Sequence, residues 1–197
     1  MARDNQRQRT RKDLLDAAAR LVAEGATPGF DEVAAAARVS RATVYRYFPG
    51  IDALLTEAAL HVAMPGPDLF DANAPSDLVE RLTLADGAVA AMMARTEPAL
   101  RAMLASAVQQ GGGEAGPARQ NRRSPLIDAA IAGAGERFPA PVATMLSNAL
   151  ALVIGTEAMI VFKDVLELED GDAEAVRRWM IRALVRAARD DAAGTVG

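Results

Sequence analysis

Apolar residues recur at helical spacing along most of the chain, and the alternating pattern of a half-buried strand is nearly absent. Near the N-terminus the repeat runs over Leu14, Leu15, Ala18, Leu21 and Val22. Because a helix turns once in about 3.6 residues, side chains three and four positions apart lie on the same face. The spacing therefore predicts an all-α fold in which each helix buries one apolar stripe.

Residues that start and stop helices divide the chain into segments. The run Thr10–Asp13 fits a capping box and predicts the start of a first helix that ends at Gly25. Ser40 is the predicted N-cap of the third helix, and the glycine-rich stretch 111–124 is a predicted loop. The later helices are predicted over 31–37, 40–48, 51–63, 76 to a break at Glu97-Pro98, onward to 110, 125–137, 140–165 and 172–191.

Charge is distributed unevenly along the chain. Residues 1–64 carry nine Lys and Arg against eight Asp and Glu, a net charge of +1, and residues 65–197 carry thirteen against eighteen, a net charge of −5. Together they give the chain its net charge of −4. The overall charge argues against nonspecific binding to nucleic acid, but a local basic patch can still attract phosphate.

Such a patch occupies the run RVSRATVYRYFPGIDALL, residues 38–55, which has no acid before Asp52. The two short helices predicted over 31–37 and 40–48, joined by a tight turn, match a helix-turn-helix. On the second helix Val44 and Phe48 share the face that points to the core. The other faces carry Arg41, Ala42, Thr43, Tyr45, Arg46 and Tyr47.

This exposed set has the chemistry of a DNA contact. Arginine donates in a fork to guanine edges or to phosphate, and tyrosine hydroxyls donate to phosphate oxygens. The small side chains of Ala42 and Thr43 permit close approach to a groove and contact with thymine methyls. The pattern alone is equally compatible with a solvated helix face that carries two arginines.

Residues 10–63 resemble the DNA-binding domain of the TetR (tetracycline repressor-like) family of transcriptional regulators. The resemblance rests on LLDAAARLVAEGA and on FDEVAAAARVSRATVYRYFPGIDALL. It implies that the helix at 40–48 enters the major groove and that a homodimer binds an inverted-repeat operator in double-stranded DNA. By position, it implies base-side roles for Arg41, Ala42, Thr43 and Arg46, and phosphate contacts for Tyr45 and Tyr47.

The sequence departs from the family pattern at three positions. Arg38 stands where a glycine is usual, so a left-handed turn there would be strained. Gly29 stands where a capping Ser or Thr often contacts phosphate, and Ile51 stands where a lysine often pairs with phosphate. The N-terminal arm either compensates for these two changes or is only solubilising; its arginines are Arg3, Arg7, Arg9 and Arg11.

The resemblance also implies the roles of the two domains: DNA binding over residues 1–64, and effector binding and dimerisation over the helical region 65–197. The predicted helices 140–165 and 172–191 look like the family's dimerisation pair. Their predicted stripes are Val153, Thr156 and Ile160 on one helix, and Val176, Met180, Leu184 and Ala187 on the other. A monomeric bundle is the alternative, and Trp179 belongs either to the core or to the interface.

A small-molecule site is predicted among the helices from 77 to 165. Methionine adapts to irregular shapes, and isolated polar residues in apolar helices need partners, which a ligand can supply. A plain core and a structural Glu157–Arg182 ion pair are the alternatives. The predicted ligand is mostly apolar with one polar or cationic group, and its predicted contacts are Met92, Met103, Gln109, Asn148, Thr156 and Glu157.

Catalysis and membrane insertion find no support in the sequence. His61 is the sole histidine and has no acidic or cysteine cluster at metal spacing, and no nucleotide-binding or nucleophile motif is present. The chain lacks cysteine, its N-terminus is charged, and its most apolar run is short and contains Glu157. We therefore expect a cytoplasmic protein that is no enzyme, holds no cofactor or metal and does not bind a membrane.

These observations predict a homodimeric, ligand-responsive transcriptional regulator, a repressor released from its operator by a small molecule. The alternative is a small-molecule-binding or protein-interaction module of the same fold with weakened operator binding. The changes at Gly29 and Ile51 favour that alternative.

Overall fold

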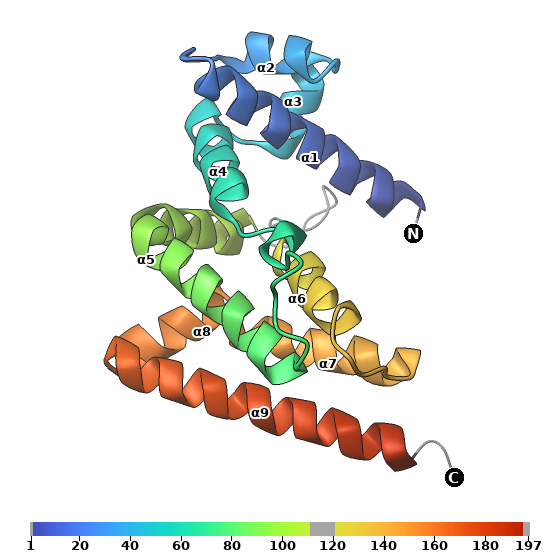
Figure 1. Cartoon of the computed structure of the whole chain (residues 1–197). Coiled ribbons are helices and arrows are strands. Elements are labelled where there is room, and N and C mark those ends of the chain that lie inside the picture. Colours follow the sequence, from blue (N-terminus) through green and yellow to red (C-terminus); the bar gives the residue numbers. More distant parts are fainter. Residues whose placement is uncertain (1, 111–120, 195–197) are drawn as a thin grey trace. The chain divides into compact units, whose positions relative to one another are not determined.

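The computed structural model describes residues 2–110 and 121–194, and its regular elements in these ranges are all helical. A 3-10 turn, η1 (Pro67–Leu69), and a π-helical turn, η2 (Val161–Val165), accompany the α-helices. The predicted all-α fold is confirmed. In chain order the α-helices are α1 (Ala2–Ala23), α2 (Phe30–Ala36), α3 (Arg41–Tyr47), α4 (Ile51–Ala63), α5 (Leu78–Gln110), α6 (Arg123–Ala132), α7 (Ala140–Val153), α8 (Thr156–Ile160) and α9 (Asp170–Gly194) (Figure 1).

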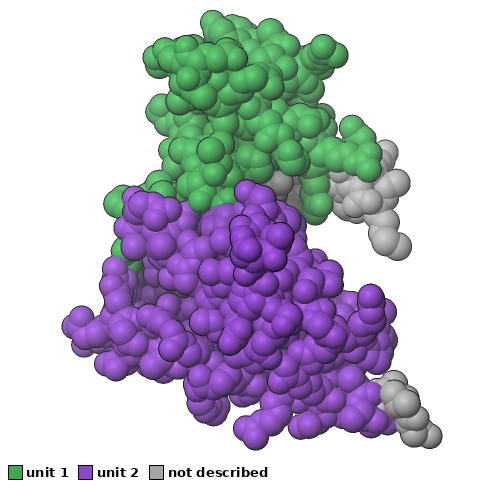
Figure 2. Space-filling view, in the orientation of Figure 1, with its two compact units in different colours: residues 1–64, 96–120 green, residues 65–95, 121–197 purple. Residues whose placement is uncertain are grey.

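The chain forms two compact units, which Figure 2 colours separately. Unit 1 contains Met1–Met64 and Thr96–Gln120, and unit 2 contains Pro65–Arg95 and Asn121–Gly197. Helices α1 to α4 and the second part of α5 therefore belong to unit 1. The first part of α5 and helices α6 to α9 belong to unit 2.

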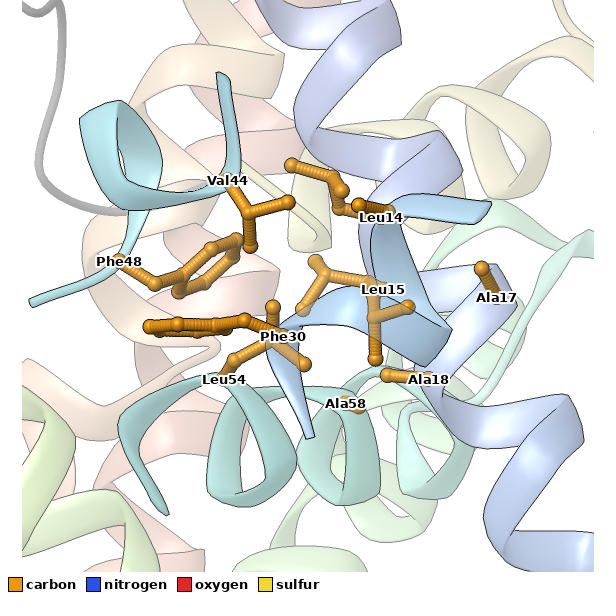
Figure 3. Packing of buried hydrophobic residues seen from close by; sticks show 11 residues of the cluster. Leu14, Leu15, Ala17, Ala18, Phe30, Val44, Phe48, Leu54 and Ala58 are labelled. Carbon is orange, nitrogen blue, oxygen red and sulfur yellow. The ribbon is translucent and has the colours of Figure 1, made fainter. Parts of the chain in front are cut away.

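The core of unit 1 joins the helix-turn-helix to the helices on either side of it. In Figure 3, Leu14 and Leu15 of α1, Val44 of α3 and Leu54 of α4 point toward one another. All four are buried, as is Phe48 at the end of α3. Their burial fixes which face of α3 points inward and leaves the opposite face to solvent.

Helices α1 and α2 end in the same way, with a residue in the left-handed region. Gly25 has φ of +84° after α1, and its N–H donates to Val22 O while that of Ala26 donates to Leu21 O. Arg38 occupies the equivalent place after α2, with φ of +56°. The predicted strain at Arg38 is thus present in the structure, because a side chain at this φ crowds the following carbonyl.

The first helix begins earlier than the capping box predicts. Helix α1 starts at Ala2, and the Thr10 hydroxyl donates to Gln6 O at 3.0 Å within the helix. A threonine inside a helix makes this bond to the preceding turn, so the Thr10–Asp13 pattern does not mark a helix start here. The prediction of a helix beginning at Thr10 is wrong.

Helix α5 is a single helix, whereas the sequence predicts a break at Glu97-Pro98. Proline has no N–H, so Pro98 removes one bond to the preceding turn without ending the helix. The start of α5 is fixed by Asp77, whose carboxylate accepts from the N–H of Glu80 at 3.0 Å. This places the cap one residue after the predicted Ser76.

The helix predicted over 140–165 is interrupted at Gly155. Arg123 donates to Ala151 O at 2.6 Å and thereby occupies the carbonyl that would accept from the N–H of residue 155 in a continuous helix. A Cβ at Gly155 would lie 2.3 Å from the same guanidinium, so any other residue would displace it. Gly155 is visible in the sequence, but the sequence does not reveal that the Arg123 side chain lies against it.

The segment Ala140–Val165 is the one described segment long and apolar enough to cross a membrane by length and composition. Its buried side chains include Leu146, Leu150 and Val153, and α7 packs against α9. Part of the segment is thus buried within unit 2, and other apolar side chains along it are exposed. The remaining boundaries differ by a few residues, with α6 ending at Ala132 instead of 137 and α9 spanning Asp170–Gly194 instead of 172–191.

Two arginines, the buried Arg81 and the half-buried Arg177, join helices within unit 2. Arg81 donates to Ala130 O at 2.9 Å and to Ala129 O at 3.2 Å, so a cation sits at the C-terminal end of α6, where the helix dipole favours it. Arg177 of α9 donates to both carboxylate oxygens of Asp86 on α5, at 3.0 and 2.9 Å. Burial raises the pKa of Asp86, an effect that Arg177 opposes but does not cancel.

We predict that Arg38→Gly stabilises the protein by about 1 kcal/mol, because glycine adopts a positive φ without steric strain. The free energy of unfolding, measured in urea, reports the gain. Arg38→Ala is the matched control, since it removes the same charge but keeps the strained Cβ. Equal stability of the Gly and Ala variants would show that the backbone at this position carries no strain.

Candidate nucleic-acid interface

Helix α3 is fixed at its start by a cap and along one face by the core. The Ser40 hydroxyl accepts from the N–H of Thr43 at 3.1 Å, which confirms the predicted N-cap. Val44 is fully buried, and Phe48 at the C-terminal end is 2% exposed. These contacts determine the rotation of α3 about its own axis.

The burial of Val44 leaves the six predicted DNA-contact residues on the other faces of α3. Arg41, Ala42, Tyr45 and Arg46 are exposed, and Thr43 and Tyr47 are half-buried. The hydroxyl of Thr43 lies 2.9 Å from that of Ser40, so part of its hydrogen-bonding capacity is used within the cap. The structure therefore brings all six together on one short helix, with two of them partly covered.

Arg41 is held in place by two side chains. It donates to Asp31 of α2 at 2.8 Å and to the hydroxyl of Tyr45 at 3.1 Å. The hydrogen bond to Tyr45 and the charge of Asp31 raise the pKa of Arg41 above its ordinary value. The Tyr45 ring in turn packs edge-on against Phe30, with ring centroids 4.5 Å apart. Because the Arg41–Asp31 pair is exposed, an anionic partner can readily replace Asp31.

Arg46 and Tyr47 form a second stacked pair. The Arg46 guanidinium lies 5.3 Å from the centroid of the Tyr47 ring, which keeps the cation extended along the surface. Tyr47 also packs against the core of unit 1. The Tyr47 ring thus contacts both the Arg46 guanidinium and the core of unit 1.

Arg11 lies inside unit 1, not on the predicted DNA-binding arm. Its guanidinium donates to both carboxylate oxygens of Glu57 at 3.2 and 2.6 Å and to Tyr47 O at 3.1 Å. It also stacks over the Phe48 ring at 4.5 Å. Arg11 of α1 therefore joins α4 to the last turn of α3, and its predicted role as an arm contact is replaced by a structural one.

The two positions that usually supply phosphate contacts are engaged elsewhere. The N–H of Gly29 donates to the Glu32 carboxylate at 3.0 Å, and a Cβ at Gly29 would meet the same carboxylate at 3.1 Å. Ile51 packs against the apolar core of unit 1. Phosphate binding, where it occurs, must rely on other groups.

Comparison with known proteins agrees with this geometry. Residues 14–58, which hold the core and the helix-turn-helix, match the model of the family described as bacterial regulatory proteins, tetR family. This part of the chain is similar to the DNA-binding region of TetR-family regulators. Over 56 residues it is 46% identical to the HTH-type transcriptional repressor LfrR of Mycolicibacterium smegmatis, an alignment that covers 28% of this chain and 30% of that relative.

The likeness of fold extends over nearly the whole chain. A TetR transcriptional regulator from Rhodococcus sp. RHA1, solved as a crystal structure, matches with a TM-score of 0.54 and 21% identity. The match covers 90% of this chain and 96% of that one. At this identity the likeness concerns the fold alone.

The single histidine of the chain has a structural partner. His61 Nε2 lies 2.8 Å from Asp16 Oδ1, which ties α4 to α1, and Lys12 bonds the other oxygen of Asp16 at 2.6 Å. Burial raises the pKa of Asp16, but the hydrogen bonds from Lys12 and His61 outweigh it and leave the pKa below its ordinary value. Among the described residues, no group of His, Asp and Glu is arranged to hold a metal ion.

The predicted ligand contacts are spread over both units. Met92, Thr156 and Glu157 belong to unit 2, where the first two are buried, and Asn148 of the same unit is exposed. Met103 and Gln109 belong to unit 1, and Gln109 is exposed. Met103 is the one of the six that lines a cavity found in the described residues of its unit.

Glu157 pairs with Arg123 at 2.6 Å, so the predicted alternative partner, Arg182, is wrong. The error has a physical reason, because the interruption at Gly155 turns Glu157 toward α6.

Two acids with a role in the candidate interface were missed: Asp31, which holds Arg41, and Glu57, which holds Arg11. In the sequence Glu57 is, like Glu157, an isolated acid in an apolar helix, so the same reasoning could have identified it.

We predict that Glu57→Ala destabilises the protein by about 3 kcal/mol, because it leaves the Arg11 guanidinium buried without its carboxylate. Chemical denaturation measures the loss. Glu174→Ala, which removes the exposed partner of Arg178 on α9, is the control and is expected to lose less than about 1 kcal/mol. Equal losses in the two variants would mean that the Arg11–Glu57 pair contributes no more than a surface pair.

Proposed function

We propose that this chain is a TetR-family regulator, a homodimeric, effector-responsive transcriptional repressor that binds double-stranded DNA through α3. The observation that carries the proposal is the division of α3 into a buried face at Val44 and an exposed face with Arg41, Ala42 and Arg46. The identity shared with a protein named as a transcriptional repressor supports the same class of function.

The exposed face suits the edge of a major groove. Arg41 and Arg46 lie five residues apart, on either side of the small residue Ala42, so the backbone can approach the bases while both guanidinium groups reach them. Tyr45 and Tyr47 stand beside the arginines, and we assign them to phosphate. On binding, a guanine edge or phosphate replaces Asp31 as the partner of Arg41.

Exposed apolar side chains of unit 2 support assembly into a dimer. They lie on α7, on η2 and the residue that follows it, and on α9, and α7 packs against α9. The stripe predicted at Val153 and Thr156 is buried within the chain, so the contact surface we propose is formed by its exposed neighbours. The members are Met145, Leu152, Val161, Val165, Leu166, Val176 and Trp179. A two-fold contact through them presents two copies of α3 to an inverted repeat.

The proposed dimer also responds to a small-molecule effector. An effector releases the operator only when it binds the DNA-incompetent dimer more tightly than the competent one. A mostly apolar molecule with one polar or cationic group fits the methionines and isolated polar residues of the helices after residue 77.

A second function is favoured by one observation. Gly29 and Ile51 do not offer the phosphate contacts that the family pattern has at these positions, since one is bonded by Glu32 and the other packs in the core. A small-molecule-binding or protein-interaction module that has lost operator affinity would show this arrangement. The salt dependence of DNA binding separates the two functions, because operator binding releases counterions and falls as salt rises.

We predict that Arg46→Ala weakens binding to the preferred duplex about tenfold and relaxes sequence preference at one base pair of each half-site. The duplex is obtained by selection from a random-sequence library, and affinity is measured by fluorescence anisotropy. Arg186→Ala, which removes an exposed charge from α9, is the control and should leave affinity unchanged. Recovery of no inverted repeat in the selection would contradict the proposal.

We predict that Leu152→Asp converts the dimer into a folded monomer. The side chain is 71% exposed, so a carboxylate there leaves the chain intact but is buried unpaired in the dimer contact. Light scattering gives the mass, and circular dichroism shows whether the helices persist. Val22→Asp, at an exposed apolar residue of α1, should remain dimeric. A native monomer for the unmodified protein would exclude this dimer.

A further inference from the structure

Unit 1 contains a cavity of about 260 Å³ that borders the recognition helix itself. One wall is formed by the end of α3 and the start of α4, with Tyr47, Phe48 and Ala53. The facing wall is formed by the second part of α5, with Met103 and Ala107. All of these residues belong to the same compact unit.

The cavity has apolar walls and an acidic edge. Asp52, in the first turn of α4, and Glu57, one helical turn further on, bring carboxylates to it, and Arg11 brings a guanidinium. Arg11 is bonded to both oxygens of Glu57, so these two charges neutralise each other. Asp52 is exposed, and its carboxylate attracts a cation to this edge of the cavity.

We propose that this cavity binds a small organic cation with an apolar body, and that its occupation weakens operator binding. The apolar body lies between Phe48 and Met103, and the cationic group lies toward Asp52. Methionine adjusts to a range of apolar shapes, which suits a site in this position. The volume admits a molecule with one aromatic ring, near the lower end for ligand sites.

The coupling to DNA rests on the proposed function and on the residues that the cavity shares with α3. Phe48 closes α3 and lines the cavity, and Tyr47 O is held by Arg11, which also lines it. A ligand that displaces either side chain changes the last turn of α3, which carries Arg46. The proposed effect of the ligand on α3 then requires no conformational change outside unit 1.

The experiment uses the full-length protein and benzyltrimethylammonium, with methyl-labelled methionine observed by NMR. Among the eight methionines, the Met103 signal is identified by its loss in Met103→Leu. We expect the cation to shift the Met103 signal and to leave that of Met145, which is exposed in unit 2, unchanged. Tetramethylammonium lacks the ring and benzyl alcohol lacks the charge, and each should bind more weakly.

Two variants test the site. Ala107→Phe fills the cavity and should abolish the shift, whereas Ala105→Phe, at an exposed position of the same helix outside the lining, should not. Asp52→Asn changes an exposed side chain, so the chain stays folded, and should weaken the cation about fivefold without affecting benzyl alcohol. No shift at Met103, or equal binding by the Ala107→Phe variant, would overturn the site.

The coupling is measured on the selected duplex. Saturating benzyltrimethylammonium should weaken operator binding about fivefold or more, and operator should weaken the cation by the same factor. Binding at Met103 with unchanged operator affinity would overturn the coupling. The NMR titration needs no DNA, so failure to find an operator would count against the proposed function and leave the test of the cavity intact.

Discussion

The Arg11–Glu57 pair is the contact on which the orientation of α3, the proposed DNA-binding helix, depends. It joins three elements at once, because the same guanidinium bonds the α4 carboxylate and the last carbonyl of α3 and covers the Phe48 ring. Helix α3 has seven residues, too few to be stable alone, so its orientation comes from such contacts and from Val44. Arg11, which looks like part of a DNA-binding arm in the sequence, therefore holds in place the helix that we propose contacts DNA.

Arginine has the same role in unit 2. Arg81 satisfies the final carbonyls of α6, Arg123 replaces a helical hydrogen bond at the end of α7, and Arg177 bridges α5 and α9 through Asp86. A guanidinium has several donors in a fixed plane, so one side chain can satisfy two or three acceptors that belong to different helices. The chain thus uses a polar residue to join apolar helices at their ends.

Local chemistry predicted much of the fold, and tertiary partners decided the rest. The all-α class and the Ser40 cap followed from spacing and from the residue types at helix ends, and the left-handed Arg38 followed from the family resemblance. The continuity of α5 through Pro98 and the interruption of the 140–165 helix did not, because the first depends on packing along the helix and the second on Arg123 from another helix. The exposed face of α3 was visible in the sequence, but the acids that hold it were not, since an isolated acid gives no sign of which distant arginine it meets.

The left-handed Arg38 also bears on how the sequence can change. A substitution that relieves the strain at this position stabilises the protein, wherever in the chain another mutation has destabilised it. Such a position is a general suppressor site. A variant with a weakened core or an altered recognition helix could thus regain its folded population through Arg38 without restoring the original contact. The exposed side chains of the adjoining helix α3, the proposed DNA contacts, are therefore freer to change than the short length of that helix suggests.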